Sequence, residues 1–569
     1  MTAGRVTRVN GALVQATGLT GAGVADVVEI GAERLAGEVV AIRDDTVTVR
    51  AYEYTGGIAP GHPVRTRGAP LTAPLGPHLL GAVFDGLLRP LSGAPPWLAP
   101  SGGDPQPPGR WTFTPTAAEG QTAEPGTPLG RVDVAGAVPY RVLVPPDARG
   151  PVTALHPKGR VTAGTVVATV AGRDVRLTER WPVRRPRPYR TRLDAAVPLA
   201  TGQRVLDTLF PVARGGSTAV PGGFGTGKTV LLQQIAKWCD ADVIVYVGCG
   251  ERGNELADVL AEFAELSDPR TGGRLADRTV VLANTSNMPV MAREASVHGA
   301  VTVAEHFRDM GLSVVVIADS TSRWAEALRE FASRGDELPV EEGYPASLAS
   351  ELAAFYERAG RVVTLAGDEG AVTTIGAVSP PGGDLTEPVT THTQRFTRAV
   401  WSLDRDLAYA RHYPAVSWTG SFARDADAIG AWHAAHGDPD WAGRRARVGG
   451  LLTEADRLGA LAELIGAAAL PGRERIGLLA GRLLREGVLQ QSALSRTDAS
   501  CDADRAAALT EAVLTVVERC QDLVAAGTPA ASVEGADFGP ILRAREECPD
   551  AAAVRAARDT VLAGLEEAR

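Results

Sequence analysis

The sequence predicts a multidomain α/β protein with a small N-terminal β-barrel, a β-rich insert, a core built on a mostly parallel sheet, and a C-terminal helical bundle. Three patterns predict it. Short alternating runs separated by glycine fill residues 1–75, continuous apolar runs alternate with helix-like stretches in 196–424, and residues 425–569 show helical periodicity rich in Ala, Leu, Arg and Glu. At 569 residues the chain is also too long for one hydrophobic core.

The N-terminal barrel is predicted from runs such as LAGEVVAIRDDTVTVRAYE, in which apolar and polar residues alternate. Alternation with period two buries one face of each strand, and many short strands with glycine-rich turns are typical of small barrels. Similar runs resume in 111–175, so we expect a β-rich insert and a linker across residues 76–195. The stretch Arg180–Arg192 is interrupted by three prolines and is expected to be the extended linker, with a nucleic-acid patch as the alternative.

The core is predicted from apolar runs of strand length that alternate with helical patterns. We expect strands at Ser217–Val220, Val243–Val247, Thr279–Ala283, Ser313–Asp319 and Val362–Leu365. Continuous apolar strands alternating with helices indicate a mostly parallel sheet that is covered on both faces. The periodicity of 425–569 then indicates a helical bundle as the last domain.

The composition narrows the class of protein. Hydrophobic residues make up 44% and charged residues 22%, as in ordinary globular proteins, and the net charge of −9 argues against a nucleic-acid partner. No apolar run approaches the roughly 18 residues of a membrane span, and no signal peptide is expected. The five cysteines are scattered without CxxC spacing, which favours a reducing cytoplasm over a disulfide framework or a zinc site.

The most informative local feature is a glycine-rich loop that contains Lys228, one of only three lysines among 58 basic residues. The run GGFGTGKT fits the phosphate-binding pattern G-x-x-x-x-G-K-[ST], and a chance glycine-rich turn is the alternative. The expected strand at Ser217–Val220 precedes the loop and a predicted helix, Thr229–Cys239, follows it, as phosphate binding requires. The candidate nucleotide-binding residues here are Gly222, Gly223, Phe224, Gly225, Thr226, Gly227, Lys228, Thr229 and Val230.

Each residue type in this loop has a role in binding phosphate. Glycines reach backbone angles that a Cβ would forbid, so that backbone N–H groups can surround a phosphate. Lys228 supplies a compact ammonium for the terminal phosphates, and Thr229 offers a hydroxyl to Mg²⁺. ATP or ADP with Mg²⁺ is therefore the expected ligand.

Two further strand ends carry candidate catalytic residues. Asp319 ends an aliphatic strand at the nucleotide edge of the sheet, where a carboxylate can hold Mg²⁺ directly or through water; a turn aspartate is the alternative. Glu251 follows Gly248-Cys249-Gly250 and is placed to polarise water for attack on the γ-phosphate, with Arg252 contacting its oxygens. The alternative for Glu251 and Arg252 is a surface ion pair of little energetic value.

An ordered set of motifs resembles the catalytic A subunit of V-type and A-type rotary ATPases. The motifs are LLGAVFDGLLRPL, WPVRRPRPY, PLATGQRVLDTLFPVARGG, GGFGTGKT, YVGCGERGNE, VVVIADSTSRWAEALRE, EEGYPASLASELAAFYERAG and AVSPPGGDLTEPVT. The resemblance spans nearly the whole chain and implies a RecA-like P-loop core. By motif position it implies Lys228 and Thr229 as phosphate and Mg²⁺ residues, Glu251 as the catalytic glutamate and Arg252 as the γ-phosphate arginine. It also implies Glu255 near the water shell of the metal and Asp319 as the Walker B aspartate.

The resemblance also implies partners. It implies an alternating ring of three A and three non-catalytic B subunits with ATP at the A/B interfaces, an arginine finger from B, and central and peripheral stalk subunits. A membrane ion-translocating sector would carry H⁺ or Na⁺, and this chain would lie at the cytoplasmic face of the membrane, with no nucleic-acid partner.

Two departures from the family pattern concern the nucleotide site. Gly223 stands where proline is expected, which should loosen the loop slightly. Val488 and Leu494 occupy places where the family has aromatic residues, one of which stacks on adenine, and Phe422 remains a candidate for the other wall of the base pocket. We therefore hypothesise weaker adenine binding or poorer discrimination between bases.

Three interpretations compete: a catalytic rotary subunit, a non-catalytic subunit of the same ring, and a hexameric termination helicase. The non-catalytic subunit should lack the loop lysine or the glutamate after the second core strand, yet Lys228 and Glu251 are both present. The helicase should carry a basic N-terminal domain with aromatic residues, and residues 1–75 are not notably basic. The sequence therefore favours the catalytic subunit.

Overall fold

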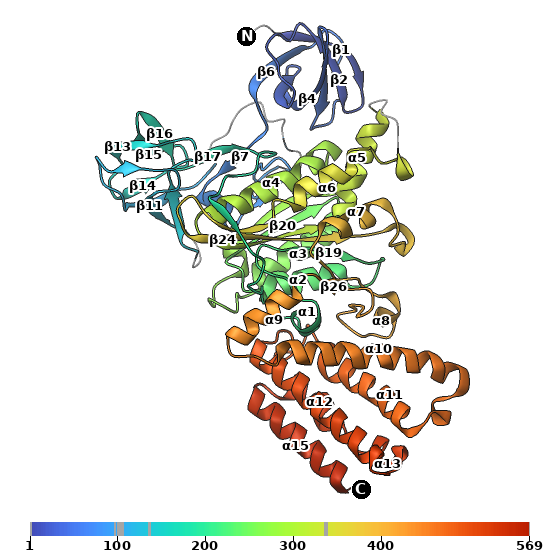
Figure 1. Ribbon diagram of the computed structural model, residues 1–569. Helices are drawn as coiled ribbons and strands as arrows, with labels where there is room; N and C mark the ends of the chain where they lie inside the picture. The colour runs from blue at the N-terminus through green and yellow to red at the C-terminus, as the bar shows by residue number, and fades with distance from the viewer. Residues whose placement is uncertain (1–2, 96–97, 99–106, 135–137, 335–339, 568–569) are drawn as a thin grey trace.

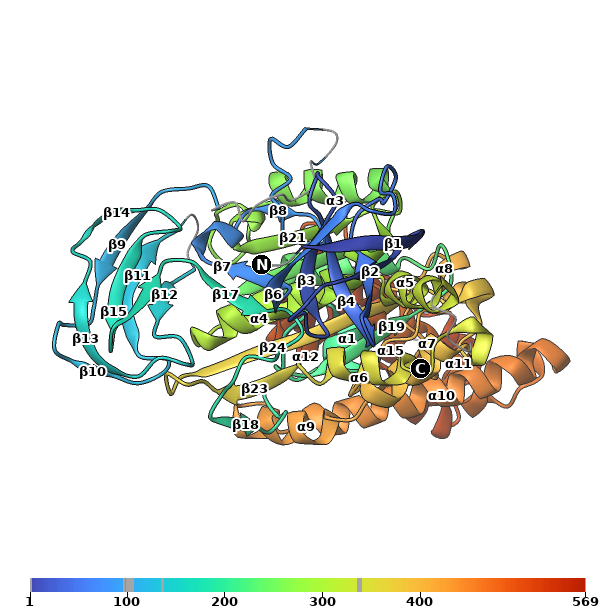
Figure 2. The same ribbon diagram turned by 90° about the horizontal axis from the view of Figure 1, so that it is seen from above.

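The computed structural model describes residues 3–95, 98, 107–134, 138–334 and 340–567. The molecule is elongated, with a β-barrel at the N-terminal end, helices at the C-terminal end, and an α/β core between them (Figure 1). A second β unit projects from one side of the core (Figures 1 and 2). Among the described residues, no helix has the length and apolar character needed to cross a membrane.

The N-terminal unit is a closed barrel with strand order β1-β2-β5-β4-β3-β6. Its strands are β1 (Gly4–Asn10), β2 (Leu13–Thr17), β3 (Asp26–Ile30), β4 (Leu35–Arg43), β5 (Thr46–Ala51) and β6 (Pro63–Pro70). Alternate residues point inward, and Val14, Val28, Val49 and Val64 are fully buried. The barrel predicted from glycine-separated alternation is confirmed.

The side unit is a pair of four-stranded antiparallel sheets, ordered β12-β11-β9-β14 and β10-β13-β15-β16. The strands are β9 (Trp111–Pro115), β10 (Thr122–Ala123), β11 (Pro128–Asp133), β12 (Tyr140–Leu143), β13 (Gly150–Leu155), β14 (Gly159–Val161), β15 (Val166–Val170) and β16 (Arg173–Arg176). Strand β7 (Thr72–Leu75), which precedes the insert, pairs with β17 (Glu179–Pro182), which follows it. Strand β12 of the insert also contacts the core directly, through Tyr140 to His306 (3.0 Å) and Arg141 to Asp368 (2.5 Å).

The core is a ten-stranded, mostly parallel sheet with the order β26-β25-β19-β24-β22-β20-β21-β8, and β23 and β18 branch from it. The central strands are β19 (Ser217–Pro221), β24 (Glu369–Val378), β22 (Ser313–Asp319), β20 (Val243–Cys249) and β21 (Thr279–Asn284). Helices α2 (Lys228–Trp238) and α3 (Gly253–Glu265) lie on one face, and α4 (Val290–Asp309), α5 (Thr321–Arg334) and α6 (Leu348–Tyr356) lie on the other (Figure 1). The predicted parallel, doubly covered sheet is confirmed.

Three parts of this sheet differ from the sequence-based expectation. The longest core strand, β24, was missed because Gly and Thr interrupt its apolar pattern in EGAVTTIGAV. The expected strand at Val362–Leu365 is β23 (Gly360–Val363), which pairs antiparallel to β24 and to β18 (Thr191–Leu193). Finally, β8 (Val83–Phe84), from the segment assigned to the insert, extends the core sheet beside β21. Two residues are too short a run for any pattern to reveal.

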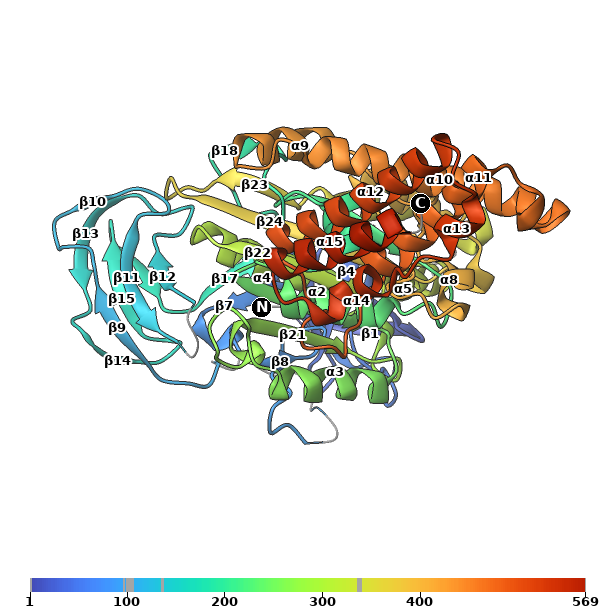
Figure 3. The same ribbon diagram turned by 90° about the horizontal axis from the view of Figure 1, so that it is seen from below.

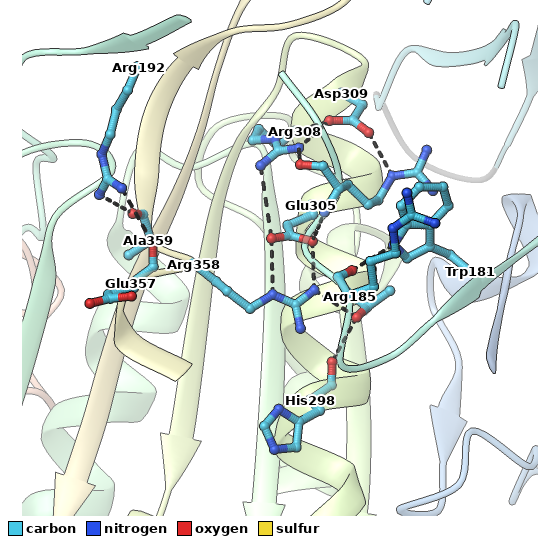
Figure 4. Close-up of polar contacts among 12 residues, drawn as sticks. Trp181, Arg185, Arg192, His298, Glu305, Arg308, Asp309, Glu357, Arg358 and Ala359 are labelled. Carbon is cyan, nitrogen blue, oxygen red and sulfur yellow. Dashed lines mark hydrogen bonds and ion pairs between the residues drawn. The ribbon is translucent and has the colours of Figure 1, made fainter. Parts of the chain in front are cut away.

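Helix α4 is buried along almost its whole length although it carries many charged side chains. Glu305 accepts hydrogen bonds from Arg358 at Nε (3.0 Å) and Nη2 (2.6 Å), and Asp309 accepts from Nε of Arg187 (2.6 Å) and Nη2 of Arg308 (2.6 Å) (Figure 4). Backbone groups complete the network, since Arg358 also donates to the carbonyl of Val183 (2.7 Å). A buried charge is tolerated only when it is paired in this way.

The stretch Arg180–Arg192, expected to be an extended linker, is an irregular connection between two short strands. Its first residues belong to β17 and its last to β18. In between, Arg187 is 5% exposed, and Arg184 donates to both oxygens of Glu294 on α4 (2.9 and 2.7 Å). Arg184 also lies within 3.4 Å of Glu38 in the barrel. Arg184 and Arg187 thus serve as partners for the acids of α4, which a sequence pattern of Pro and Arg does not reveal.

The C-terminal domain is helical, as predicted, and packs against one end of the core (Figure 3). Its helices are α9 (Ala426–Ala435), α10 (Trp441–Ile465), α11 (Gly472–Leu484), α12 (Ala503–Ala525), α13 (Ala530–Glu534), α14 (Gly539–Glu547) and α15 (Ala551–Glu567). Arg204, the first residue of α1 (Arg204–Leu209), reaches into this domain and is completely buried. It donates to Asp498 (2.6 Å) and to the carbonyls of Val488 (2.7 Å) and Gln490 (2.6 Å).

We predict that Arg204→Ala weakens the attachment of the C-terminal domain. It leaves Asp498 buried with only Arg545 as an ion-pair partner among the described residues (2.7 Å), and breaking a buried pair typically costs about 3–5 kcal/mol. Thermal unfolding and limited proteolysis should show earlier release of residues 425–569. The control is Arg457→Ala, which removes an exposed pair with Glu454 and should change little. An unchanged proteolysis pattern for Arg204→Ala would contradict the interpretation.

Candidate nucleotide site

The glycine-rich loop joins the end of β19 to the start of α2 at the carboxyl edge of the sheet. Gly225 (φ 79°) and Gly227 (φ 87°) adopt left-handed conformations that favour glycine, and these let the chain turn tightly into the helix. The Nζ of Lys228 donates to the carbonyls of Gly222 (2.5 Å) and Gly223 (2.8 Å). The lysine thus lies along the loop and places its charge at the N-terminal end of α2, where an anion is favoured.

Asp319 lies beside this loop at the end of β22, and it is 3% exposed. Its Oδ2 accepts hydrogen bonds from Oγ1 of Thr229 (3.1 Å) and from the hydroxyl of Tyr246 (3.2 Å). Burial raises the pKa of Asp319, while the hydrogen bonds from Thr229 and Tyr246 and the charge of Lys228 act in the opposite direction. The structure therefore brings together the two oxygen ligands that the sequence predicted for a metal.

Glu251 follows β20, the strand next to β22, after a turn at Gly250 (φ 73°). Burial, reinforced by the negative charge of Asp319, raises the pKa of Glu251 to about 7, although Arg323 and Ser320 oppose the shift. Lys228 also interacts electrostatically with Glu251 and Asp319. Lys228, Glu251 and Asp319, predicted from separate motifs, thus form one electrostatic cluster. Within it, the raised pKa of Glu251 suits this carboxylate to accept a proton near neutral pH.

Arg252 and Glu255 lie at the outer side of this cluster, at the start of α3. The Nη1 of Arg252 is 3.6 Å from Oε1 of Glu255, and the Arg252 side chain is 68% exposed. Phe224 in the loop is also strongly exposed. These side chains face away from the protein interior, so they are free to contact a ligand or a neighbouring chain.

A cavity of about 470 Å³ adjoins the loop, and its size suits a small-molecule ligand. Thr226, Gly227 and Val230 form one side, and the segment Gln490–Leu494 forms another. Tyr413 lines the cavity, and its ring lies 3.5 Å from the position that a Cβ on Gly227 would take. Sequence patterns missed this aromatic residue, for which the only available signal was its position before Pro414 in an irregular segment.

The three residues expected near the base lie in different places. Leu494 lines the cavity and is 98% exposed. Val488 is fully buried, and it contributes a carbonyl to Arg204. Phe422 is placed elsewhere: it lies on β26 (Phe422–Ala423), paired with Val400 of β25 (Ala399–Val400), outside the residues that line the cavity. Phe422 does not line this cavity, and its expected role as a wall of the base pocket stays a prediction.

A second group of metal-ligand types, among the residues that the structure describes, comprises Glu294, His298 and Glu351. Both carboxylate oxygens of Glu294 already accept hydrogen bonds from Arg184. A cation there would have to displace or oppose that guanidinium, so the group is explained by the ion-pair network around α4. Thr229 and Asp319, which offer only oxygen atoms, fit Mg²⁺ better.

A phosphate loop at the start of a helix, with a buried carboxylate on a neighbouring parallel strand, defines a P-loop nucleotide-binding protein. Models of four domains match along the chain. They are the ATP synthase alpha/beta family beta-barrel domain at 6–68, the ATPsynthase alpha/beta subunit barrel-sandwich domain at 107–184, the ATP synthase alpha/beta family nucleotide-binding domain at 202–423, and the C-terminal domain of V and A type ATP synthase at 430–531. The chain belongs to the ATP synthase alpha/beta family, among the alpha chains of V-type enzymes and their A-type counterparts.

Two relatives illustrate the similarity. The V-type ATP synthase alpha chain of Anaeromyxobacter dehalogenans (strain 2CP-C) is 49% identical over 575 residues, which cover 99% of this chain and 98% of the relative. The V-type ATP synthase alpha chain of Nitrosococcus oceani is 47% identical over 562 residues, which cover 96% of this chain and 94% of the relative. The structure of the assembled ATPase EscN from the enteropathogenic E. coli type III secretion system has a TM-score of 0.64 at 21% identity, over 90% of this chain and 100% of that one, and so supports the fold alone.

We predict that Tyr413→Ala weakens ATP binding roughly 5- to 150-fold, because stacking of a base on an aromatic ring is worth about 1–3 kcal/mol. Binding of inorganic tripolyphosphate, which has no base, should not change. Tyr409→Ala is a matched control, since Tyr409 is exposed and does not line the cavity. Titrating ATP and GTP in parallel also tests the hypothesis of poor base discrimination, which a strong preference of the unaltered protein for ATP would exclude. Equal losses for ATP and tripolyphosphate would contradict the stacking role.

Proposed function

We propose that this chain is the catalytic A (alpha) subunit of a V/A-type rotary ATPase, which couples ATP hydrolysis or synthesis to proton or sodium transport through partner subunits. The observation that carries the proposal is the meeting of Lys228, Asp319 and Glu251 at one edge of the core sheet. A nucleotide-binding chain without catalysis needs the lysine but not a neighbouring carboxylate whose pKa suits it to accept a proton.

In this proposal the loop and its lysine hold the phosphates of ATP. Backbone N–H groups of the loop and the ammonium of Lys228 bind the β- and γ-phosphates, and Arg252 contacts the γ-phosphate from its exposed position. Thr229 and Asp319 would hold Mg²⁺, and Glu255 would lie near its water shell. The bound ion would offset the charge that develops on the phosphates.

Glu251 is proposed to orient the attacking water and to take its proton during in-line attack on the γ-phosphorus. Its raised pKa makes it a better base than an ordinary glutamate, while it is still ionised above neutral pH. Tyr413, Val230 and Leu494 border the cavity in which the base is proposed to lie.

The exposure of Arg252 and Phe224 supports a site that a second chain completes. We propose that this chain alternates with the non-catalytic B subunit in a ring of three A and three B subunits, and that B contributes an arginine finger. Central and peripheral stalk subunits would connect the ring to the membrane sector at the cytoplasmic face. The helical domain, held to α1 by Arg204, would move against the central stalk when the site closes.

We predict that Lys228→Ala yields a chain that folds and assembles with its partners but does not turn over ATP. The large loss is expected because the phosphates lose the ammonium that lies along the loop. ATPase assays of the purified complex measure the effect. Lys158→Ala, an exposed lysine of the insert, is the control and should keep full activity. Normal turnover by Lys228→Ala would refute the site.

We predict that kcat/KM for ATP rises with pH and levels off above about pH 7, because Glu251 must lose its proton to act as a base. Glu251→Gln should lower the rate roughly 10²–10⁴-fold and remove this dependence. Retained turnover by Glu251→Gln would place the base elsewhere.

The raised pKa of Glu251 also predicts an effect on folding stability. Ionisation of this carboxyl destabilises the folded chain as pH rises from about 4.5 through 7. Glu251→Gln should therefore be more stable than the parent at pH 8 but not at pH 4.5.

A further inference from the structure

Tyr246 stands out as a buried polar side chain that contacts the metal-binding carboxylate without being a candidate ligand itself. On β20 it pairs with Ile317 of β22, and Gly248 pairs with Asp319 two residues further on. Tyr246 and Asp319 are therefore diagonal neighbours on the same face of the sheet, a separation that a long aromatic side chain can span. The Tyr246 hydroxyl donates to Oδ2 of Asp319 at 3.2 Å.

The surroundings of Tyr246 hold its ring in one place. The side chain is 1% exposed, and its ring meets that of Phe263 edge to face, with centroids 5.6 Å apart and an interplanar angle of 89°. A phenol hydroxyl carries its proton at neutral pH, and the hydrogen bond to Asp319 uses it as the donor. The hydroxyl is therefore a fixed, neutral donor.

A carboxylate needs such a donor because the last torsion of an aspartate side chain is broad and does not fix its oxygens by itself. Thr229 donates to the same oxygen, but Thr229 is itself a proposed ligand, so the geometry of its hydroxyl must also satisfy the ion. Tyr246 is not a proposed metal ligand, so its hydroxyl is free to orient Asp319 alone. Partners of this kind orient metal ligands and are commonly needed for tight binding.

We propose that Tyr246 is a positioning residue, whose hydroxyl holds the Asp319 carboxylate in the orientation that binds Mg²⁺ with the nucleotide. This inference rests on the proposed function, since it assumes that Thr229 and Asp319 bind the ion. It assigns Tyr246 no contact with the nucleotide. The ring could instead serve only to fill space beneath the sheet, and the test separates these two roles.

The experiment measures how much Mg²⁺ strengthens binding of the non-hydrolysable analogue AMP-PNP to the full-length chain assembled with its partner subunits. Affinity is titrated in excess Mg²⁺ and in EDTA for the parent and for Tyr246→Phe. The matched control is Tyr52→Phe, which removes another buried hydroxyl that donates to a carboxylate, Glu38 in the barrel (2.6 Å). A second readout follows Mn²⁺ binding in the presence of ADP by electron paramagnetic resonance.

For Tyr246→Phe we expect the gain in AMP-PNP affinity on adding Mg²⁺ to fall roughly 10- to 100-fold, and the affinity for Mn²⁺ to fall by the same factor. Binding of AMP-PNP in EDTA should not change. Tyr52→Phe should keep the full gain. If Tyr246→Phe keeps it too, or if both variants lose it equally, the positioning role is overturned. Should the phenylalanine variant not assemble, Tyr246→Met keeps an apolar side chain against Phe263 and is measured in the same way. If the parent itself shows no gain from Mg²⁺, the proposed metal site fails as well, which is a distinct result.

Discussion

The rule that a buried charge must have a partner governs how the parts of this protein are joined. Helix α4 lies within the core but carries acidic side chains, and their partners come from other parts of the chain. Glu294 is paired with Arg184, which also lies close to Glu38 of the barrel, and Asp309 is paired with Arg187 at the base of the insert. Such pairs add little net stability, but a misplaced domain would leave a charge unpaired, so they fix one arrangement of the domains.

The same rule operates at the candidate site, where burial shifts the pKa values of charged side chains. Burial raises the pKa of both Asp319 and Glu251, and the charge of Asp319 raises that of Glu251 further. The ammonium of Lys228 interacts with both carboxylates and offsets part of this effect at Asp319. A divalent cation would offset the negative charge of the two carboxylates. The ring of Tyr246, packed on Phe263 of α3, places a donor against Asp319 from within the hydrophobic core, so the site is formed by the sheet as much as by the loop.

Much of the fold and of the site was predictable from local patterns. The strand at Ser313–Asp319 agrees with the structure at both ends, because six aliphatic or small residues ending in Asp satisfy both burial and the sheet edge. Lys228 and Thr229 were identifiable because the phosphate loop is short and its chemistry is local. Strand β24, in contrast, has a weak pattern and is stabilised by its neighbours β19 and β22. Its existence depends on tertiary pairing.

By itself, the sequence determined the class of each domain, the phosphate loop, and the carboxylates that accompany it, because periodicity and short motifs express local chemistry. Only the tertiary structure decided which aromatic residue borders the cavity. An irregular segment brings Tyr413 to the loop, while Phe422, on β26, does not line the cavity. It also decided that Arg184 and Arg187 are partners for the acids of α4, since pairing of charges depends on residues more than a hundred positions apart.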